Sequence, residues 1–266
     1  MALTVTHAGT ATFNTTAGSK TLTATPAVAD LIIVVVAATG VTTGLGVTDN
    51  NPDGHGTYKQ ITSALKNASA DLMAIFVRAD LIQRAVSTIW TTSGDGSSTG
   101  GGLDVWRIAG CTLAALQAIR GFGAQANGAA AGTPTVALGA AALTGNALIG
   151  AVFNGTNTAT LTPPTSWTED TDAGYNTPTT GLEDAHIASG FTGSSVAWGS
   201  TSASAFSAVA CEISAAAGQT SVFPPRGGEA LDITLSDTPK LQAVKKSVFC
   251  LGDKWVRRRS GILVPA

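Results

Sequence analysis

The segment from Asp49 to Gly54 reads DNNPDG and is the best candidate for a cation site in this sequence. Asp49, Asn51 and Asp53 place oxygen donors at alternate positions before the glycine, which matches the first half of a calcium-binding loop. The twelfth position of such a loop is Gln60 instead of a bidentate Glu, and no flanking helix is expected. Asn, Pro, Asp and Gly are also ordinary turn formers. We therefore expect a simple loop more than a calcium site, and no other cofactor.

Acid–base chemistry would need carboxylates or histidines that the fold brings together. The candidates are the acidic groups Glu169, Asp170, Asp172 and Glu183, Asp184, and the histidines His7, His55 and His186. The acidic groups could act as glycosidase carboxylates, but both lie near expected loops, where solvated charge is the usual explanation. The histidines are far apart in the sequence and no two of them show metal-ligand spacing.

One segment matches the sequence pattern of a nucleophile motif but lacks the structural context that this motif requires. The string GSSTG, with Ser98 at its centre, matches GxSxG, but it lies in a low-complexity glycine-rich loop with no helix expected after it. Phosphate loops, zinc clusters and dinucleotide fingerprints are absent. The sequence therefore predicts no enzyme.

Five tryptophans could stack on sugars if they were exposed. Trp90, Trp106 and Trp198 lie in apolar runs typical of strands, so we expect them in the core. Trp167 and Trp255 remain, and Trp167 is the candidate glycan contact.

Composition indicates an ordered protein with an unusually neutral surface. Of 266 residues, 44% are hydrophobic and only 12% are charged, so small neutral polar groups must cover most of the surface, which suits protein contacts. The net charge of −2 divides unevenly: the chain up to Ala217 holds 7 Lys and Arg against 13 Asp and Glu, and the chain from Gly218 holds 8 against 4. The basic arm carries Trp255 and the run Arg257, Arg258, Arg259, and an acidic protein surface is a better partner for it than nucleic acid.

Targeting signals and cysteine frameworks are also missing. Cys111, Cys211 and Cys250 are odd in number and widely spaced, which favours buried free thiols. The N-terminal segment lacks the regions of a signal peptide, and the longest apolar run, Leu31 to Ala38, is too short to cross a bilayer. We expect a protein made in a cytoplasm, not secreted by a signal peptide and without a membrane span.

The chain predicts an all-β fold. Short runs rich in Val, Ile, Thr and aromatic residues alternate with clusters of Gly, Asn, Asp and Pro, which is typical of an antiparallel β-sandwich or barrel. The run from Leu31 to Ala38, LIIVVVAA, predicts a strand buried on both faces. The segment ALQAIRG from Ala115 fits either a helical turn or a strand edge.

An internal repeat organises these strands. Residues 145–214 follow the order of residues 29–110: GNALIGAVFNGT matches ADLIIVVVAATG, SWTEDTDAG matches GVTDNNPDG, and three further strand motifs match in order. We expect one sandwich over residues 1–217, with each half contributing strands to both faces of one core. Residues 218–266 form an appended arm or small β module.

The succession ADLIIVVVAATG, VTDNNPDGHGTYKQI, LDVWRIAG, GNALIGAVFNGT, SWTEDTDAG, LEDAHIASG and AFSAVACEIS resembles a group of tailed-bacteriophage virion proteins. That resemblance covers about residues 29–214 and implies a jelly-roll or concanavalin-like sandwich found on heads, tails or fibres, without catalytic residues. It leads us to expect a virion structural protein, a decoration or tail appendage that binds other virion proteins and forms a homo-oligomer. The alternatives are an adhesin that recognises a host surface glycan and, third, a glycan-degrading enzyme.

Overall fold

A computed structural model describes residues 2–13, 19–24, 30–50, 58–66, 71–78, 88–93, 100–111, 115–155, 161–176 and 179–215. All of them belong to one compact unit, Met1–Val222. The basic arm, with Trp255, Arg257, Arg258 and Arg259, lies outside the described residues.

The described residues form strands almost throughout, which confirms the expected all-β class. In chain order they are β1 (Thr4–Phe13), β2 (Ser19–Ala24), β3 (Leu31–Thr39), β4 (Gly46–Thr48), β5 (Tyr58–Leu65), β6 (Asp71–Arg78), β7 (Thr88–Ser93), β8 (Gly100–Ala109), α1 (Ala115–Ala118), β9 (Ile119–Gly128), β10 (Thr135–Ala137), β11 (Ala147–Asn154), β12 (Thr168–Asn176), β13 (Thr179–Ile187), β14 (Ser195–Ala197) and β15 (Phe206–Ile213). The ambiguous ALQAIRG segment is both things in turn, since α1 leads directly into β9.

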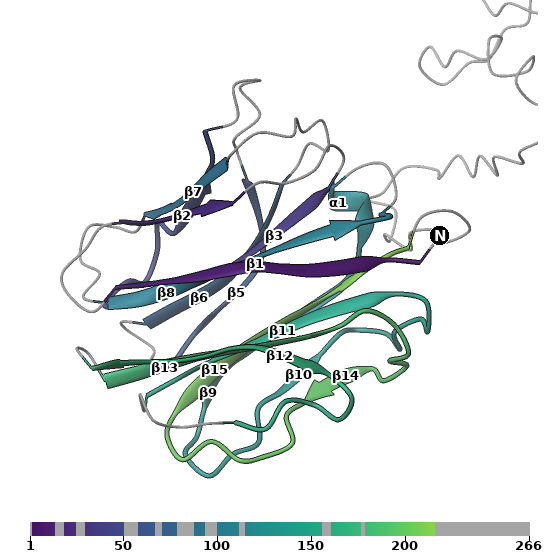
Figure 1. Cartoon of the computed structure of the whole chain (residues 1–266). Helices are drawn as coiled ribbons and strands as arrows, with labels where there is room; N and C mark the ends of the chain where they lie inside the picture. Colours follow the sequence, from purple (N-terminus) through teal and green to yellow (C-terminus); the bar gives the residue numbers. More distant parts are fainter. Residues whose placement is uncertain are drawn as a thin grey trace, which may run out of the picture. The chain divides into compact units, whose positions relative to one another are not determined.

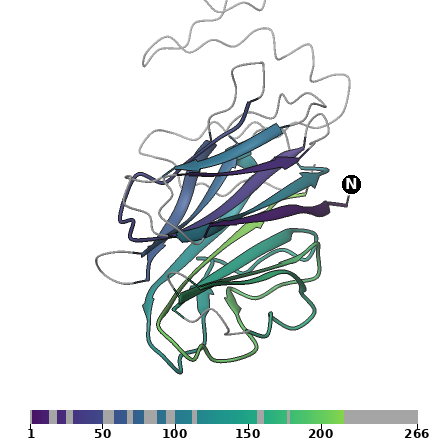
Figure 2. The ribbon, with the colours of Figure 1, turned by 60° about the vertical axis from the view of Figure 1, so that its left-hand side comes forward.

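Two five-stranded antiparallel sheets form the centre of the unit. Their strand orders are β1-β8-β3-β6-β5 and β12-β13-β11-β15-β9. A small sheet, β2-β7-β4, accompanies the first, and the pair β10-β14 accompanies the second. In Figure 1 the first-half strands, purple to blue, lie above the second-half strands, teal to green, and Figure 2 shows the same grouping from another side.

The repeat is visible in the strand order. Read from its β9 edge, the second main sheet runs β9-β15-β11-β13-β12, which is the first sheet with each strand replaced by its counterpart in the second half. Within each half the chain passes between the main and the small sheet at every step except β5 to β6 in the first half and β11 to β12 to β13 in the second, a course similar to that of a jelly roll. The unit is therefore a tandem of two jelly rolls.

Each half builds a whole sheet on one side of the shared core, whereas we had expected each half to supply strands to both faces. The reason lies in the ladders: β8 returns to pair between β1 and β3, so the first half completes its own sheet, and β15 does the same between β9 and β11. A sheet that is apolar on both faces then needs cover on both.

Side chains of β3 point alternately into two different cores, so both faces of this strand are covered. This confirms the expected doubly buried strand. Leu31, Ile33 and Val35 face the core shared with the second main sheet. Ile32 and Val34 face the opposite way, into a core shared with Val47 of β4 and with Leu22 of β2. The second half has its own outer core under β10 and β14.

Core positions expected for two tryptophans and for the Cys211 thiol are also confirmed. Trp106 is 0% and Trp198 is 3% exposed. Cys211 is a buried free thiol, and Cys111 is a free thiol of intermediate exposure. The Trp90 side chain and Cys250 lie outside what the structure describes.

The two main sheets meet with an approximate two-fold relation. Strands β1 and β8 lie against β12 and β13, and the counterpart strands β9 and β15 lie against β5 and β6. This gives the interface two sides built from equivalent elements, as in an isologous dimer. We call them the first side (β1, β8, β12, β13) and the second side (β5, β6, β9, β15).

Bulges mark the outermost ladder of every main-sheet edge. The pairings β1–β8, β5–β6, β12–β13 and β9–β15 all shift register, while the four pairings that flank β3 and β11 run without interruption. The bulges of β5 and β12 fall at equivalent residues, Ile61 and Asp170. Bulged edges resist pairing with a further strand.

Candidate functional site

Polar and ionisable side chains gather between the sheets on the first side of the interface. The cluster consists of His7 and Thr10 on β1, Asp104 and Trp106 on β8, Asp170 and Thr171 on β12, and Asp184 and His186 on β13. Its members come from both jelly rolls.

Two bulges aim side chains into this cluster. In β1 the register shifts between His7 and Gly9, so His7 and Thr10, an odd number of residues apart, point to the same face. In β12 the shift between Glu169 and Thr171 does the same for Asp170 and Thr171. A regular strand would have sent one residue of each pair to the opposite face.

Asp104 is the acceptor at the centre. Its Oδ1 accepts hydrogen bonds from Thr10 and from Thr171 (2.6 Å), and it lies 2.9 Å from His7 Nε2. Thr10 and Thr171 Oγ1 atoms are 2.6 Å apart. Because Thr171 belongs to the second half, its bonds to Asp104 and Thr10 join the two jelly rolls.

Asp170 makes the reciprocal connection. Its Oδ2 accepts a hydrogen bond from Trp106 Nε1 of the first half at 2.8 Å, and lies 2.6 Å from His186 Nδ1 of its own half. Each aspartate is thus bonded to a histidine of its own jelly roll and to a neutral donor of the other.

Asp184 is fully buried, as Asp104 is. It is 0% exposed, and burial raises its pKa well above the usual 3.8, with the charges of Asp104, Asp170 and Glu183 and a hydrogen bond to Asp104 acting in the same direction. Its surroundings therefore favour the protonated form of the carboxyl group.

The two histidines and Thr10 bring the cluster near solvent. The side chains of His7 and His186 are 20% and 13% exposed, against 0% for Asp104 and 5% for Asp170. Burial, the largest single effect, lowers the pKa of His7, but its hydrogen bond to Asp104 and the charges of Asp104 and Asp170 together raise it above 6.5.

The cluster could move protons but is poorly placed to meet a substrate. Aspartate–histidine pairs are suitable general acids and bases, yet a catalytic group must come within hydrogen-bond reach of a reacting atom. Asp104 and Asp184 are enclosed, and their neighbours are other members of the cluster. Within the described residues, no group of three or more His, Cys, Asp or Glu is arranged to hold a metal ion.

Comparison with the second side shows that this polarity is local. Val35 pairs with Asp104 and Ile75, and the equivalent Ala151 pairs with Val209 and Asp184. Each sheet therefore carries one aspartate and one aliphatic residue at this level, and the two-fold relation brings the aspartates together.

The other cluster members also have mostly apolar counterparts. By the same ladders, Trp106 corresponds to Cys211, His186 to Val77, His7 to Phe122, Thr10 to Ala124 and Asp170 to Ile61, while Thr171 corresponds to Thr62. The sequence interpretation kept His7 and His186 apart and missed the cluster. A strand-by-strand alignment of the halves would have shown polar residues opposite apolar ones.

The acidic groups expected near loops lie instead on strands β12 and β13. Glu183 faces away from the cluster, is 1% exposed and accepts a hydrogen bond from the Leu161 backbone N–H. Burial raises its pKa to about 8, and the charges of Asp172 and Glu169 add to this. It is a protonated structural acid under a loop, and the explanation by solvated charge fails for it.

The first residue of the expected calcium loop has protein partners. Asp49 Oδ2 accepts hydrogen bonds from Arg78 Nη1 and from Tyr58 Oη (3.0 Å), and the side chains of Asp49 and Arg78 are 0% and 1% exposed. A cation at Asp49 would have to compete with this buried guanidinium. Asn51 and Asp53 lie outside the described residues, so the calcium site stays a prediction.

Trp167 is poorly placed to bind a glycan. It is 9% exposed, its ring meets Phe191 edge-on with centroids 5.8 Å apart, and a Cβ on Gly150 would lie 3.3 Å from it. The ring fills the outer core of the second half, where no sugar can stack on it. Ser98 and His55 lie outside the described residues.

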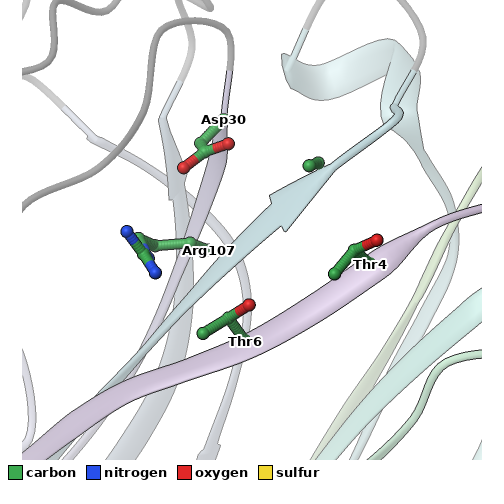
Figure 3. Close-up of a pocket in the computed structure, with 5 residues that line it drawn as sticks. Thr4, Thr6, Asp30 and Arg107 are labelled. Atoms are coloured by element: carbon green, nitrogen blue, oxygen red, sulfur yellow. The ribbon is translucent and has the colours of Figure 1, made fainter.

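A polar pocket of about 180 Å³ opens on the first half, away from the cluster. It is lined by Thr4, Thr6, Asp30, Arg107 and Ala109, from β1, β8 and the residue before β3 (Figure 3). The second-half counterpart of Arg107 is Glu212, which accepts hydrogen bonds from Arg120 (2.6 Å) and from the Leu143 backbone N–H (2.9 Å). Protein atoms thus occupy in one half the place that is a pocket in the other.

Comparisons with known proteins returned no match to a family model, a curated protein or a solved structure. The described part of the chain contains no helix of the length and apolarity that a membrane crossing requires.

Proposed function

We propose that the chain is a structural protein of a virus particle, of the tailed-bacteriophage kind, that acts by assembling with other virion proteins. The observation that carries this proposal is the enclosure of the acid–base cluster, whose central residues Asp104 and Asp184 are 0% exposed, with Asp104 bonded to Thr171 of the other jelly roll. The acid–base side chains of the cluster therefore contribute to holding the two jelly rolls together.

The architecture supports the same conclusion. Jelly rolls are recurrent building blocks of viral capsids and of lectins, which is an argument by fold analogy. The low charged fraction of 12% suits broad protein contacts. Because all four main-sheet edges are bulged, contacts through faces, loops and the basic arm are favoured over strand addition.

Particle incorporation tests this proposal. The full chain, made in the cytoplasm of the host, is expected to sediment as a homo-oligomer and to join particles of the virus that encodes it. A variant with Arg257, Arg258 and Arg259 changed to Ala is expected to join them poorly, while Lys59→Ala, which removes one exposed charge from β5, leaves incorporation unchanged. Failure of the unmodified chain to join particles would contradict the proposal, and full incorporation of the triple variant would contradict the role of the arm.

A second candidate function, recognition of a host surface glycan, is favoured by the pocket at Arg107. A carboxylate, a guanidinium and two threonine hydroxyls offer both donors and acceptors to sugar hydroxyls. A glycan array probed with the full chain and with the double variant Thr4→Val, Thr6→Val, which keeps side-chain shape, tests it. Signal that the double variant loses would support recognition through this pocket, and a blank array would remove it. A reducing-sugar assay that stays flat would dismiss the third candidate, a glycan-degrading enzyme.

A further inference from the structure

The two carboxyl groups at the centre of the cluster face each other from different jelly rolls. Asp104 lies on β8 and Asp184 on β13, both are 0% exposed, and the two carboxyl groups lie close enough to form a hydrogen bond when one of them carries a proton. Strands β8 and β13 are in contact across the interface. This pair is a direct polar link between the halves at the depth of the apolar core.

The hydrogen-bond donors that the structure describes around the pair serve only one of its four carboxyl oxygens. Asp104 Oδ1 is served by Thr10, Thr171 and His7. Among the described residues no donor reaches Asp104 Oδ2 or either oxygen of Asp184. Two buried carboxylates in this arrangement would repel each other and leave three acceptors unsatisfied, whereas one proton between them removes the repulsion and engages two of the three oxygens in a hydrogen bond.

We propose that Asp104 and Asp184 share one proton and so form a proton-dependent latch, which loosens the first side of the interface between the jelly rolls when the proton is lost. The proposal is independent of the proposed function, because it concerns how the tandem holds together.

Charged neighbours on every surrounding strand favour retention of that proton. Asp184 is faced by Asp104 from β8 and Asp170 from β12, and Glu183 adjoins it on β13. His7 on β1 and His186 on β13 lie beyond them, each bonded to one of those aspartates. Burial and three neighbouring acids act in one direction on Asp184, and the histidines are already engaged.

The second side of the interface would not respond in the same way. Ile75 and Val209 stand at the positions equivalent to Asp184 and Asp104, and both are 0% exposed in the shared core. Loss of the shared proton would therefore weaken the first side and leave the second side packed. The two jelly rolls would then open at the first side, with the second side as the hinge.

The pH dependence of unfolding of the full chain tests the latch. A group whose pKa is raised on folding gives stability that is lost as pH rises, by about tenfold in the unfolding equilibrium constant per pH unit for one proton. Asp184→Asn keeps the size of the side chain and offers Asp104 a donor at every pH. Above about pH 5, the unfolding equilibrium constant of the unmodified chain is therefore expected to rise more steeply with pH than that of Asp184→Asn, by a factor of about ten per pH unit. The control Glu183→Gln, on the other face of β13, retains the part due to Asp184.

Infrared spectroscopy of the chain with isotope-labelled aspartate measures carboxyl protonation directly, independently of any effect on stability. A protonated-carboxyl C=O band is expected at neutral pH and is expected to be absent from Asp184→Asn. Equal pH slopes in the unmodified chain and Asp184→Asn, or no such band at neutral pH, would overturn the proposal. If Asp184→Asn does not fold, the double variant Asp104→Val, Asp184→Ile, which copies the second side, takes its place with the same expectations.

Discussion

The two sides of the interface between the jelly rolls use equivalent strands and opposite chemistry. On the first side Asp104, Asp184 and their partners form a hydrogen-bonded cluster, and on the second side Ile75 and Val209 pack without polar groups at the same positions. Strand order and pairing are therefore insensitive to which chemistry fills the interface. The difference teaches that the topology comes from the ladders, while the response to conditions comes from a few side chains.

The outer layers of the two halves make the same point. The first half covers its main sheet with three strands, β2, β7 and β4. The described residues of the second half use two short strands, β10 and β14, with Leu161, Trp167 and Trp198 packed beside them. Large side chains can take over cover that a strand provides elsewhere.

The largest effect is expected from placing an aspartate on the second side. Val209→Asp would bury a carboxylate at the position equivalent to Asp104. Three donors surround Asp104, but only one of their counterparts on the second side, Thr62, is polar. We expect a loss of more than about 4 kcal/mol of unfolding free energy. Urea unfolding followed by tryptophan fluorescence measures this, and a loss below about 1 kcal/mol would break the comparison.

A smaller loss is expected when the first side loses its largest side chain. Trp106 is fully buried and donates to Asp170, so Trp106→Ala should cost about 3–5 kcal/mol through a cavity and a lost hydrogen bond. Its counterpart Cys211→Ala removes one sulfur atom and should cost about 1 kcal/mol. Equal losses in the same urea titrations would show that the two sides contribute alike.

The pH dependence of the unmodified chain sharpens the comparison further. Raised pKa values of Asp184, Glu183 and His7 all give stability that is lost as pH rises: for Glu183 it is fully present below 4.5 and lost through about 8, and for His7 it is fully present below 6.5 and lost above it. Thermal unfolding midpoints are therefore expected to fall between about pH 5.5 and pH 8.5. A midpoint that rises over this range would contradict the signs of these shifts.

The smallest effect is expected at the edge of the second side. Phe122, the counterpart of His7, is 45% exposed, so Phe122→Ala should change the unfolding free energy by less than about 1 kcal/mol. His7→Ala leaves Asp104 with one donor fewer and should cost more. If Phe122→Ala proves the more costly of the two, its ring has a packing role that its exposure does not indicate.

Much of the fold could be predicted from the sequence because it rests on local patterns. The doubly apolar run from Leu31 to Ala38 predicted a buried central strand, and the repeated order of strand motifs predicted a duplicated sandwich. Which strands share a sheet was predicted wrongly, since pairing of β8 with β1 and β3 depends on contacts across most of a half.

The site was harder to predict, because it depends on two bulges and on the two-fold relation. Strict alternation sends His7 and Thr10 to opposite faces, and Gly9, which has a φ of 141° at the register shift, is the sequence signal of the bulge that brings them together. Likewise Asp104 and Asp184 are 80 residues apart in the sequence and meet only when the sheets stack. The exposed loops expected to carry function were the easier pattern to see.

Amide hydrogen exchange of the full chain at about pH 6 and about pH 9, corrected for the intrinsic dependence of exchange on pH, tests the central claim that the two sides differ in kind. We predict that protection in β8 and β13 falls at the higher pH while protection in β6 and β15 is retained. An equal loss of protection on both sides, or none on either, would contradict the account.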